Sequence, residues 1–335
     1  MFFDKAVIFT DIHFGMKNNS RHHNQDCEDF ITWMIDEAHK RGIKKCFFLG
    51  DWHHNRASIN VSTLNYTTSN LRKLNDSFDE VIMITGNHDL YYREKREIHS
   101  LSMIQDFPKI RMINESMFIE DGIAFIPWLC DDEWKKLKEI DCKYMFGHFE
   151  LPFFKMNAMI EMPNHGGIQA SMLDKPDYVF TGHFHKRQYN SNIHYIGNAF
   201  PHNYADAQDN DRGYMFLEWD KEPIFVNWPE CPKYVTCGLV ELIDDPAKFL
   251  DATTYARIKL DVDISYEEAS FIKENFMDKY KCREIQLVPV KEVEEEYEAG
   301  EIHFESVEQI VVSQLQTIES NTIDTDKLIN IYQNL

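Results

Sequence analysis

The sequence predicts an α/β protein with a β-sheet at its centre. Short runs rich in β-branched and aromatic residues alternate with amphipathic helical patterns, and 43% of the 335 residues are hydrophobic, which is ample for a packed core. No run approaches the roughly 18 apolar residues of a membrane span. Charged residues interrupt the apolar N-terminus at Asp4, Lys5 and Asp11. We therefore expect a cytoplasmic protein without a membrane segment.

The alternation begins with the predicted strand KAVIFT, an amphipathic helix that ends before Gly42, and a second strand, KKCFFLG. These three elements form a β-α-β unit, and the pattern then continues along the chain. In order, the expected elements are a strand at 5–10, a helix at 26–41, a strand at 44–50, a helix at 61–74, and strands at 80–86, 122–128, 143–147, 177–182, 193–197 and 213–219.

Two prolines in WPECPKY (228–234) follow the last of these strands and indicate a domain boundary near 230–240. We therefore assign residues 1–235 to a first domain and 236–290 to a small α+β unit. This unit is expected to hold strands at 257–264 and 283–290 and a helix between them that opens with the capping-box pair Ser265 and Glu268. The remainder, 291–335, is predicted to be an acidic linker followed by two amphipathic helices.

The formal net charge of -21 is unusual for a protein that binds nucleic acid. Its distribution is uneven, because two basic and eleven acidic side chains lie within 291–335. Divalent cations bound to carboxylates would also return positive charge locally. The seven cysteines are scattered and form no CxxC pair, so we expect buried thiols, not a disulfide framework or a zinc knuckle.

Polar residues with metal-binding side chains follow five of the predicted strands. In open α/β sheets, sites form at the carboxyl ends of the strands, so these residues are expected to converge. Mixed imidazole and carboxylate donors suit manganese, iron or zinc better than calcium or magnesium. A carboxylate shared by two ions holds them close enough to clamp a phosphate. The candidate residues are Asp11, His13, Asp51, Asn87, His88, His148, His183 and His185.

The motifs DIH, GDWHH, GNHD, GHFE and GHFH, which contain these residues, resemble those of the calcineurin-like metallophosphoesterase superfamily. The resemblance implies a β-sandwich flanked by helices and two divalent metal ions, for which Mn²⁺ is the expected choice. It implies that Asp11, His13, Asp51 and His185 hold the first metal, and that Asp51, Asn87, His148 and His183 hold the second. Asp51 is then the bridge between the two metals.

The same resemblance implies three catalytic roles. His88 corresponds to the histidine that stabilises the transition-state phosphate or protonates the leaving oxygen. Asp89 is expected to orient or polarise His88. His54 stands where SbcD-type nucleases often carry a second histidine that faces the phosphate.

Within the superfamily, the chain is similar to SbcD-type DNA repair nucleases, above all to the recombination endonuclease subunits of T-even-like phages. It lacks the GDxVDRG pattern of serine/threonine protein phosphatases, and the stretches FIPWLCDDEW and DRGYMFLEW are similar to the phage subunits. The similarity covers 1 to about 230. It departs at Asn198-Ala199, where many relatives carry Ser-Pro or Thr-Pro, so the DNA-facing loop is expected to differ in detail here.

The resemblance implies a nuclease domain at 1–235, a capping domain at 236–290 that positions DNA, and a tail at 291–335 that binds an SbcC-like coiled-coil ATPase. Such relatives also form homodimers. We therefore expect a manganese-dependent DNA exonuclease and endonuclease in the bacterial or infected-host cytoplasm. The candidate contacts to the DNA backbone, for which a solvated loop is an equal alternative, are Lys17, Arg21, Arg93, Lys186 and Arg187.

Two other functions share the metal ligands. A phosphodiesterase or phosphatase that acts on small nucleotides is supported by the acidic composition and the short capping unit. A non-catalytic scaffold, in which the metals only order the fold, is disfavoured because a structural site has no need of the non-ligand His88.

Overall fold

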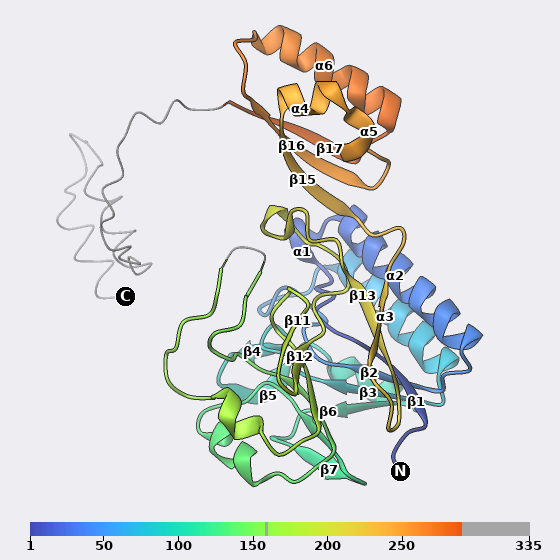
Figure 1. Ribbon diagram of the computed structural model, residues 1–335. Helices are drawn as coiled ribbons and strands as arrows, with labels where there is room; N and C mark the ends of the chain where they lie inside the picture. Colours follow the sequence, from blue (N-terminus) through green and yellow to red (C-terminus); the bar gives the residue numbers. More distant parts are fainter. Residues whose placement is uncertain (158–159, 290–335) are drawn as a thin grey trace, which may run out of the picture. The chain divides into compact units, whose positions relative to one another are not determined.

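The computed structural model describes residues 1–157 and 160–289 (Figure 1). The predicted acidic linker and both terminal helices lie outside these residues. Met1–Val290 form one compact unit, in which two six-stranded sheets and one three-stranded sheet carry the fold.

The first sheet has the strand order β14-β13-β1-β2-β3-β6. β1, β2, β3 and β6 run parallel, whereas β13 and β14 add antiparallel strands at one edge. The central strands are the β-rich runs of the sequence, and they are buried because the sheet is covered on both faces. The bounds are β1 Lys5–Phe9, β2 Lys45–Phe48, β3 Glu80–Ile84, β6 Ile110–Ile113, β13 Gly213–Glu218 and β14 Ile224–Asn227.

The second sheet has the order β11-β12-β10-β9-β8-β7. Its middle strands are parallel, and β7 and β11 pair antiparallel at the two edges. The bounds are β7 Phe118–Glu120, β8 Ile123–Ile126, β9 Tyr144–His148, β10 Tyr178–Gly182, β11 Gln188–Asn190 and β12 Ile193–Tyr195.

Alternate residues of each strand point to opposite faces, and this periodicity builds three layers of core. Ile8, Phe47 and Ile82 of the first sheet pack with Phe146 and Phe180 of the second in one buried cluster. The intervening residues of the first sheet pack instead against helices α2 (Arg21–Lys40) and α3 (Val61–Ser77), which lie side by side in Figure 1. Two face-to-face sheets with helices outside them confirm the predicted sandwich.

The third sheet consists of three parallel strands in the order β15-β16-β17, with helices on one side. Its helix α6 begins with the predicted capping box, in which Ser265 and Glu268 bond reciprocally. β15 was not predicted, and it spans the expected boundary at 235. The bounds are β15 Lys233–Gly238, α4 Leu239–Asp244, α5 Pro246–Phe249, β16 Thr254–Leu260, α6 Tyr266–Tyr280 and β17 Glu284–Pro289.

All seven cysteines are free and buried, which confirms the prediction of unpaired thiols. Among the described residues, no helix is both long enough and apolar enough to cross a membrane. The remaining short elements are α1 Met16–Asn19, β4 Leu90–Tyr92, β5 Lys95–His99, η1 Ser102–Asp106, η2 Glu133–Glu139, η3 Ala170–Leu173 and η4 Tyr204–Asp206.

Candidate binuclear metal centre

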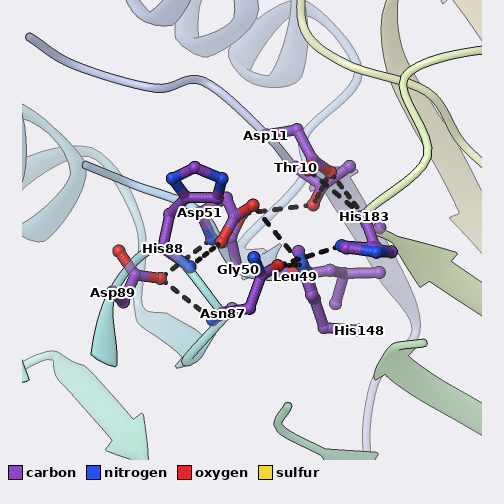
Figure 2. A network of polar contacts seen from close by, with 12 residues as sticks. Thr10, Asp11, Leu49, Gly50, Asp51, Asn87, His88, Asp89, His148 and His183 are labelled. Carbon is purple, nitrogen blue, oxygen red and sulfur yellow. Dashed lines mark hydrogen bonds and ion pairs between the residues drawn. The ribbon is translucent and has the colours of Figure 1, made fainter. Parts of the chain in front are cut away.

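The carboxyl ends of five strands from both sheets meet at one place, and the structure brings all seven predicted metal ligands there. Figure 2 shows five of them, Asp11, Asp51, Asn87, His148 and His183. The sandwich produces this arrangement because β1, β2 and β3 are parallel neighbours, as are β9 and β10. Asp11 and His13 follow β1, Asp51 follows β2, Asn87 follows β3, His148 ends β9, and His183 and His185 follow β10.

Among the described residues, four overlapping groups of donor atoms at this place can hold a metal ion, and two of them contain carboxylates. Asp11, His13 and Asp51 offer ligand atoms within 4.8 Å of one another, and so do Asp51, His148 and His183. Asp51 belongs to both groups and is buried. Its Oδ2 lies 3.6 Å from His13 Nε2 and 3.5 Å from His148 Nε2, so this carboxylate faces both groups, as a bridging ligand would.

Hydrogen bonds around the second group fix which nitrogen of each imidazole carries a proton. His148 Nδ1 lies 2.7 Å from the Leu49 carbonyl oxygen, and His183 Nε2 lies 3.2 Å from Glu150 Oε2. Both oxygens accept, so these nitrogens donate. In the neutral rings, His148 Nε2 and His183 Nδ1 then direct lone pairs at Asn87 Oδ1, 3.2 and 2.9 Å away. Acceptors that converge in this way form a site for a cation.

The charges in this group support the same conclusion. Burial opposes ionisation of Asp51, but the neighbouring imidazoles, His148 first, hold the pKa of its carboxyl well below the usual range. Burial also acts to lower the pKa of His148. The Asp51 carboxylate, with Oδ2 3.5 Å from His148 Nε2, outweighs burial and raises that pKa to about 9. A proton on His148 thus occupies a position at which a metal ion would bind.

His13 shows that the first group also fits a metal ion. The residue is only 2% exposed, and among the described residues neither ring nitrogen has a hydrogen-bond partner. Its Nε2 lies 3.8 Å from Asp11 Oδ1 and 3.6 Å from Asp51 Oδ2, too far for hydrogen bonds. Burial of unpaired polar atoms costs free energy, which a coordinated cation offsets. The donor set therefore fits two divalent ions.

The glycines of the motifs allow the loops to approach so closely. A Cβ on Gly50, which has φ 97°, would lie 2.5 Å from His148 Nδ1 and 2.7 Å from the backbone nitrogen of Gly86. A Cβ on Gly182 would collide with the carboxylate of Asp11 at 2.7 Å. Side chains at these positions would displace metal donors, so the motifs require glycine there.

A third group of donor atoms within 4.8 Å of one another contains no carboxylate and consists of His13 together with His88 and His54, which stack on each other. Their rings are 5.2 Å apart and 16° from parallel, and both are partly exposed. His88 Nδ1 lies 2.7 Å from the carbonyl oxygen of His54 and donates to it. The backbone N–H of His88 donates to Asp51 Oδ1 at 2.8 Å. These bonds hold His88 by one nitrogen and leave Nε2 available for a phosphate oxygen.

The Asp89 carboxylate forms no hydrogen bond with the His88 ring, which it was expected to orient or polarise. Its carboxylate accepts backbone N–H groups of Asp51 and Gly86 at 2.8 and 2.9 Å, and of Trp52 and His53 at 3.0 and 3.2 Å. No bond to the His88 ring is formed, since that ring is held by a backbone carbonyl. Burial first, and then the charge of Asp51, raise the pKa of Asp89 to about 7. Asp89 therefore ties two ligand loops together.

The basic residues predicted to contact DNA are mostly paired within the chain. Arg21 is exposed at the start of α2. Each of the other four side chains already bonds to a protein group, with which a DNA phosphate would have to compete. Arg93 pairs with Glu150 at 2.5 Å, Lys186 with Asp209 at 2.8 Å, Arg187 donates to Asn227 Oδ1 at 2.6 Å, and Lys17 donates to the Tyr234 hydroxyl.

His202 is a residue at this site that sequence reasoning missed. Its ring is 5.3 Å from that of His13 and 5.2 Å from that of His185, and the three histidines form a further group with donor atoms within 4.8 Å. No motif marks His202, because it follows an irregular segment and not a strand. The nearest signal is the departure at Asn198-Ala199, which lies just before it.

Two cavities share Asn203, and metal ligands line the first of them. The first, of about 230 Å³, is lined by His183, His185 and Asn203 among others. The second, of about 400 Å³, also includes Asn203 and reaches Lys17 and Arg283. Asn203 therefore lines both cavities.

Three tyrosines line or border the second cavity. Tyr234 and Tyr255 are stacked, with rings 4.8 Å apart and 5° from parallel, and Tyr204 meets Tyr234 edge-on at 5.1 Å. The Lys17 ammonium lies 4.5 Å from the centre of the Tyr255 ring. Aromatic surface and positive charge are thus combined in one cavity, which we call the tyrosine cavity.

Comparison with known proteins gives one curated relative and several similar structures. The chain is 26% identical over 226 residues to exonuclease subunit 1 of Enterobacteria phage T4, and the match covers 65% of this chain and 66% of the relative. It therefore spans just under two thirds of that relative's length. Similar solved structures include the nuclease MPE of Pseudomonas putida, at 16% identity, TM-score 0.29, and 56% and 66% coverage of the two chains. A dimetal phosphatase from Danio rerio matches at 12% identity, TM-score 0.38, and 67% and 98% coverage.

The family model of calcineurin-like phosphoesterases matches residues 5–187. This span is more than half of the chain, and it includes the donors that both sheets contribute to the metal centre. The chain therefore belongs to the calcineurin-like phosphoesterase family.

Proposed function

We propose that the chain is the catalytic subunit of a DNA nuclease that hydrolyses phosphodiester bonds with two Mn²⁺ ions. The observation that carries this proposal is the position of Asp51 in two donor groups, with His88 beside them and held by only one ring nitrogen. The two cations, when bound, would neutralise the phosphate and supply hydroxide near neutral pH. A carboxylate bridge next to a free imidazole nitrogen suits phosphoryl chemistry, whereas a purely structural metal site needs neither.

We assign separate roles in the reaction to the residues that bind the metals and to those that contact the substrate. Asp11, His13, Asp51 and the donors of β9 and β10 hold the cations. His88 acts on the substrate as the doubly protonated imidazolium: its Nδ1–H stays with the His54 carbonyl, and its Nε2–H donates a hydrogen bond to a phosphate oxygen or passes its proton to the leaving oxygen, which leaves the ring neutral. His54, stacked on His88, limits the motion of that ring and lines the phosphate position.

DNA is the proposed substrate because the cavities extend beyond a single phosphate. A strand whose phosphate occupies the metal centre can continue past Asn203 into the tyrosine cavity, where bases meet aromatic rings and phosphates meet Lys17 and Arg283. Stacking on aromatic side chains contributes about 1–3 kcal/mol per base and is tolerant of sequence. The relative is named exonuclease subunit 1, and the word exonuclease supports DNA as the substrate. The word subunit supports a role for this chain as one subunit beside a partner protein.

We propose the remaining organisation on the same basis. Residues 1–235 form the nuclease domain, 236–290 position DNA, and 291–335 bind an SbcC-like ATPase. A homodimer is a further proposal. The net charge of -21 favours a partner, since it opposes the approach of DNA to the isolated chain.

A competition among three substrates tests the substrate class. The pure protein with Mn²⁺ is incubated with a labelled oligonucleotide, a cyclic nucleotide and a nucleotide monophosphate, each with and without a coiled-coil ATPase encoded nearby. We expect cleavage of the oligonucleotide and little turnover of the small nucleotides. Turnover of a small nucleotide with intact DNA would establish the alternative, which the acidic composition and the short capping unit support. No activity on any substrate would favour the scaffold.

A further inference from the structure

We propose that His202 is an additional ligand of the first metal, beside His13 and His185, and that it makes this position selective for nitrogen-preferring transition metals. The inference rests on the proposed two-metal site, but not on DNA as the substrate. It assigns a role to a residue outside the five motifs.

The first argument is that the His202 side chain is buried without partners. The residue is 0% exposed, and among the described residues neither Nδ1 nor Nε2 has a hydrogen-bond partner. A neutral imidazole has one donor and one acceptor, and burial of both without partners costs free energy. A residue retained only for packing would not require these polar atoms. Metal coordination would satisfy one of them.

The second argument is that the ring lies against residues that hold the first metal. A ring nitrogen of His202 lies within 4.8 Å of ligand nitrogens of both His13 and His185. The three rings meet edge to face, at 88° and 79° to that of His202. His13 is itself buried with two unpaired nitrogens. The two neighbouring buried rings thus carry four unpaired nitrogens. This indicates that a metal ion binds between His13 and His202.

The third argument is that the backbone of His202 is fixed by a buried ionic network. The His202 N–H donates to Asp206 Oδ2 at 3.0 Å, and Arg212 lies 3.7 Å from the other oxygen of that carboxylate. Arg212 is 0% exposed and also pairs with Asp209 at 2.9 Å and contacts Asn198. A fixed backbone keeps the ring next to the metal position before any metal binds, and such preorganisation is typical of ligand residues.

On the side away from the metal position, other aromatic rings pack against His202 and disfavour a direct catalytic role for it. Phe200 lies 5.1 Å from it and His23 lies 5.3 Å from it, both edge-on. His23 Nε2 is already engaged with the His13 carbonyl oxygen at 2.9 Å. Substrate therefore cannot reach His202 from this side, so a direct catalytic role is disfavoured and a ligand role remains.

The consequence is a first site with three imidazoles and two carboxylates. Affinity of nitrogen-rich sites rises from Mn²⁺ through Co²⁺ to Zn²⁺, whereas Mg²⁺ prefers oxygen ligands. The second site, with two imidazoles, an amide and the shared carboxylate, should discriminate less. The two positions are thus expected to fill in sequence with Co²⁺.

Titration of the metal-free full-length protein with Co²⁺ tests the proposal, followed by calorimetry and by visible absorption. We expect two binding steps in the unchanged protein. His202→Leu should weaken the tighter step at least tenfold and alter its absorption band, while the weaker step is retained. His194→Leu is the matched control, because His194 is half-buried on β12 and packs on Tyr178 and Phe180. It should change neither step.

The outcomes separate the two proposals. Equal affinities and spectra for His202→Leu and the unchanged protein would overturn the ligand role and leave the two-metal site intact. Absence of two binding steps in the unchanged protein would instead contradict the site itself. His202→Gln provides a second variant if His202→Leu does not fold, and retention of both steps and of the spectrum in His202→Gln would equally count against a histidine ligand.

Discussion

Four of the residues with metal donors hold backbone conformations that L-amino acids rarely adopt. Their φ angles are 50° for Asp11, 53° for His13, 62° for Asp51 and 86° for His183. Each costs of order 1–3 kcal/mol and persists only where surrounding contacts impose it. Those contacts are present: the N–H groups of Asp11 and His13 donate to the carbonyls of Gly50 and Asp51 at 3.0 and 3.1 Å. The ligand loops are therefore set before metal binds.

His88→Ala should separate catalysis from metal binding. The ring is held by the His54 carbonyl, and its removal leaves the donors of both groups in place. We expect oligonucleotide cleavage to slow by roughly 10²–10⁴-fold, the range for loss of a proton-transfer group, with both metals still bound. Cleavage rates together with metal analysis of the dialysed protein measure both quantities. Loss of a metal ion would contradict the assignment.

Asp89→Asn should destabilise the protein before it affects chemistry. An amide NH₂ would face two of the four backbone N–H groups that the carboxylate now accepts, and leave them unsatisfied. We expect a loss of about 2 kcal/mol in the free energy of unfolding, measured with urea. If stability is unchanged and only the rate falls, the original expectation that Asp89 polarises His88 would be restored.

The contrast between these residues shows what the sequence can reveal at this scale. The seven donors were predicted because each follows a buried strand, and strand ends share an edge. The direction of the Asp89 side chain depends on the amides of Asp51 and Trp52, which belong to another loop, and the residues next to Asp89 in the chain do not reveal it. His202 was missed for the same reason, since its neighbours His13 and His185 are distant in the sequence.

At the scale of elements, the central strands were predictable and the edge strands were not. β1, β2 and β3 are buried, so their sequences are continuously apolar. β7, β11 and β14 are short and half-exposed. Their pairing depends on the adjacent strand more than on their own composition. β15 follows the prolines that suggested a boundary, and it is a strand because it pairs with β16.

Helix α2 and strand β17 are tied by an ion pair. The Arg283 guanidinium lies 2.6 Å from both Asp26 oxygens, and the Asp26 side chain is only 6% exposed. Arg283→Met leaves this carboxylate buried and unpaired, so we expect a loss of about 2–3 kcal/mol in urea unfolding. Asp26→Asn combined with Arg283→Met should cost less than the sum of the single changes. Additive losses would show that the two elements are not coupled through this pair.

At the scale of the whole molecule, the net negative charge disfavours DNA binding, whereas the metal centre and the tyrosine cavity favour it. The chain carries a net charge of -21, yet the site attracts cations and the tyrosine cavity contains Lys17 and Arg283. Divalent ions, when bound, would reduce the negative charge where the proposed phosphate enters. The sequence predicted the fold class and the metal chemistry because both depend on local patterns. It could not predict the tyrosine cavity, which depends on how Tyr234 and Tyr255 of separate strands stack.

The central claim is that Asp51 serves two metals in the hydrolysis of DNA. The most direct test is the rate of Mn²⁺-dependent cleavage of a labelled oligonucleotide by Asp51→Ala beside the unchanged protein, both confirmed as folded by circular dichroism. Since Asp51 belongs to both donor groups, the account predicts that the variant loses cleavage entirely while the unchanged protein cleaves. Cleavage by Asp51→Ala at the rate of the unchanged protein would contradict the account.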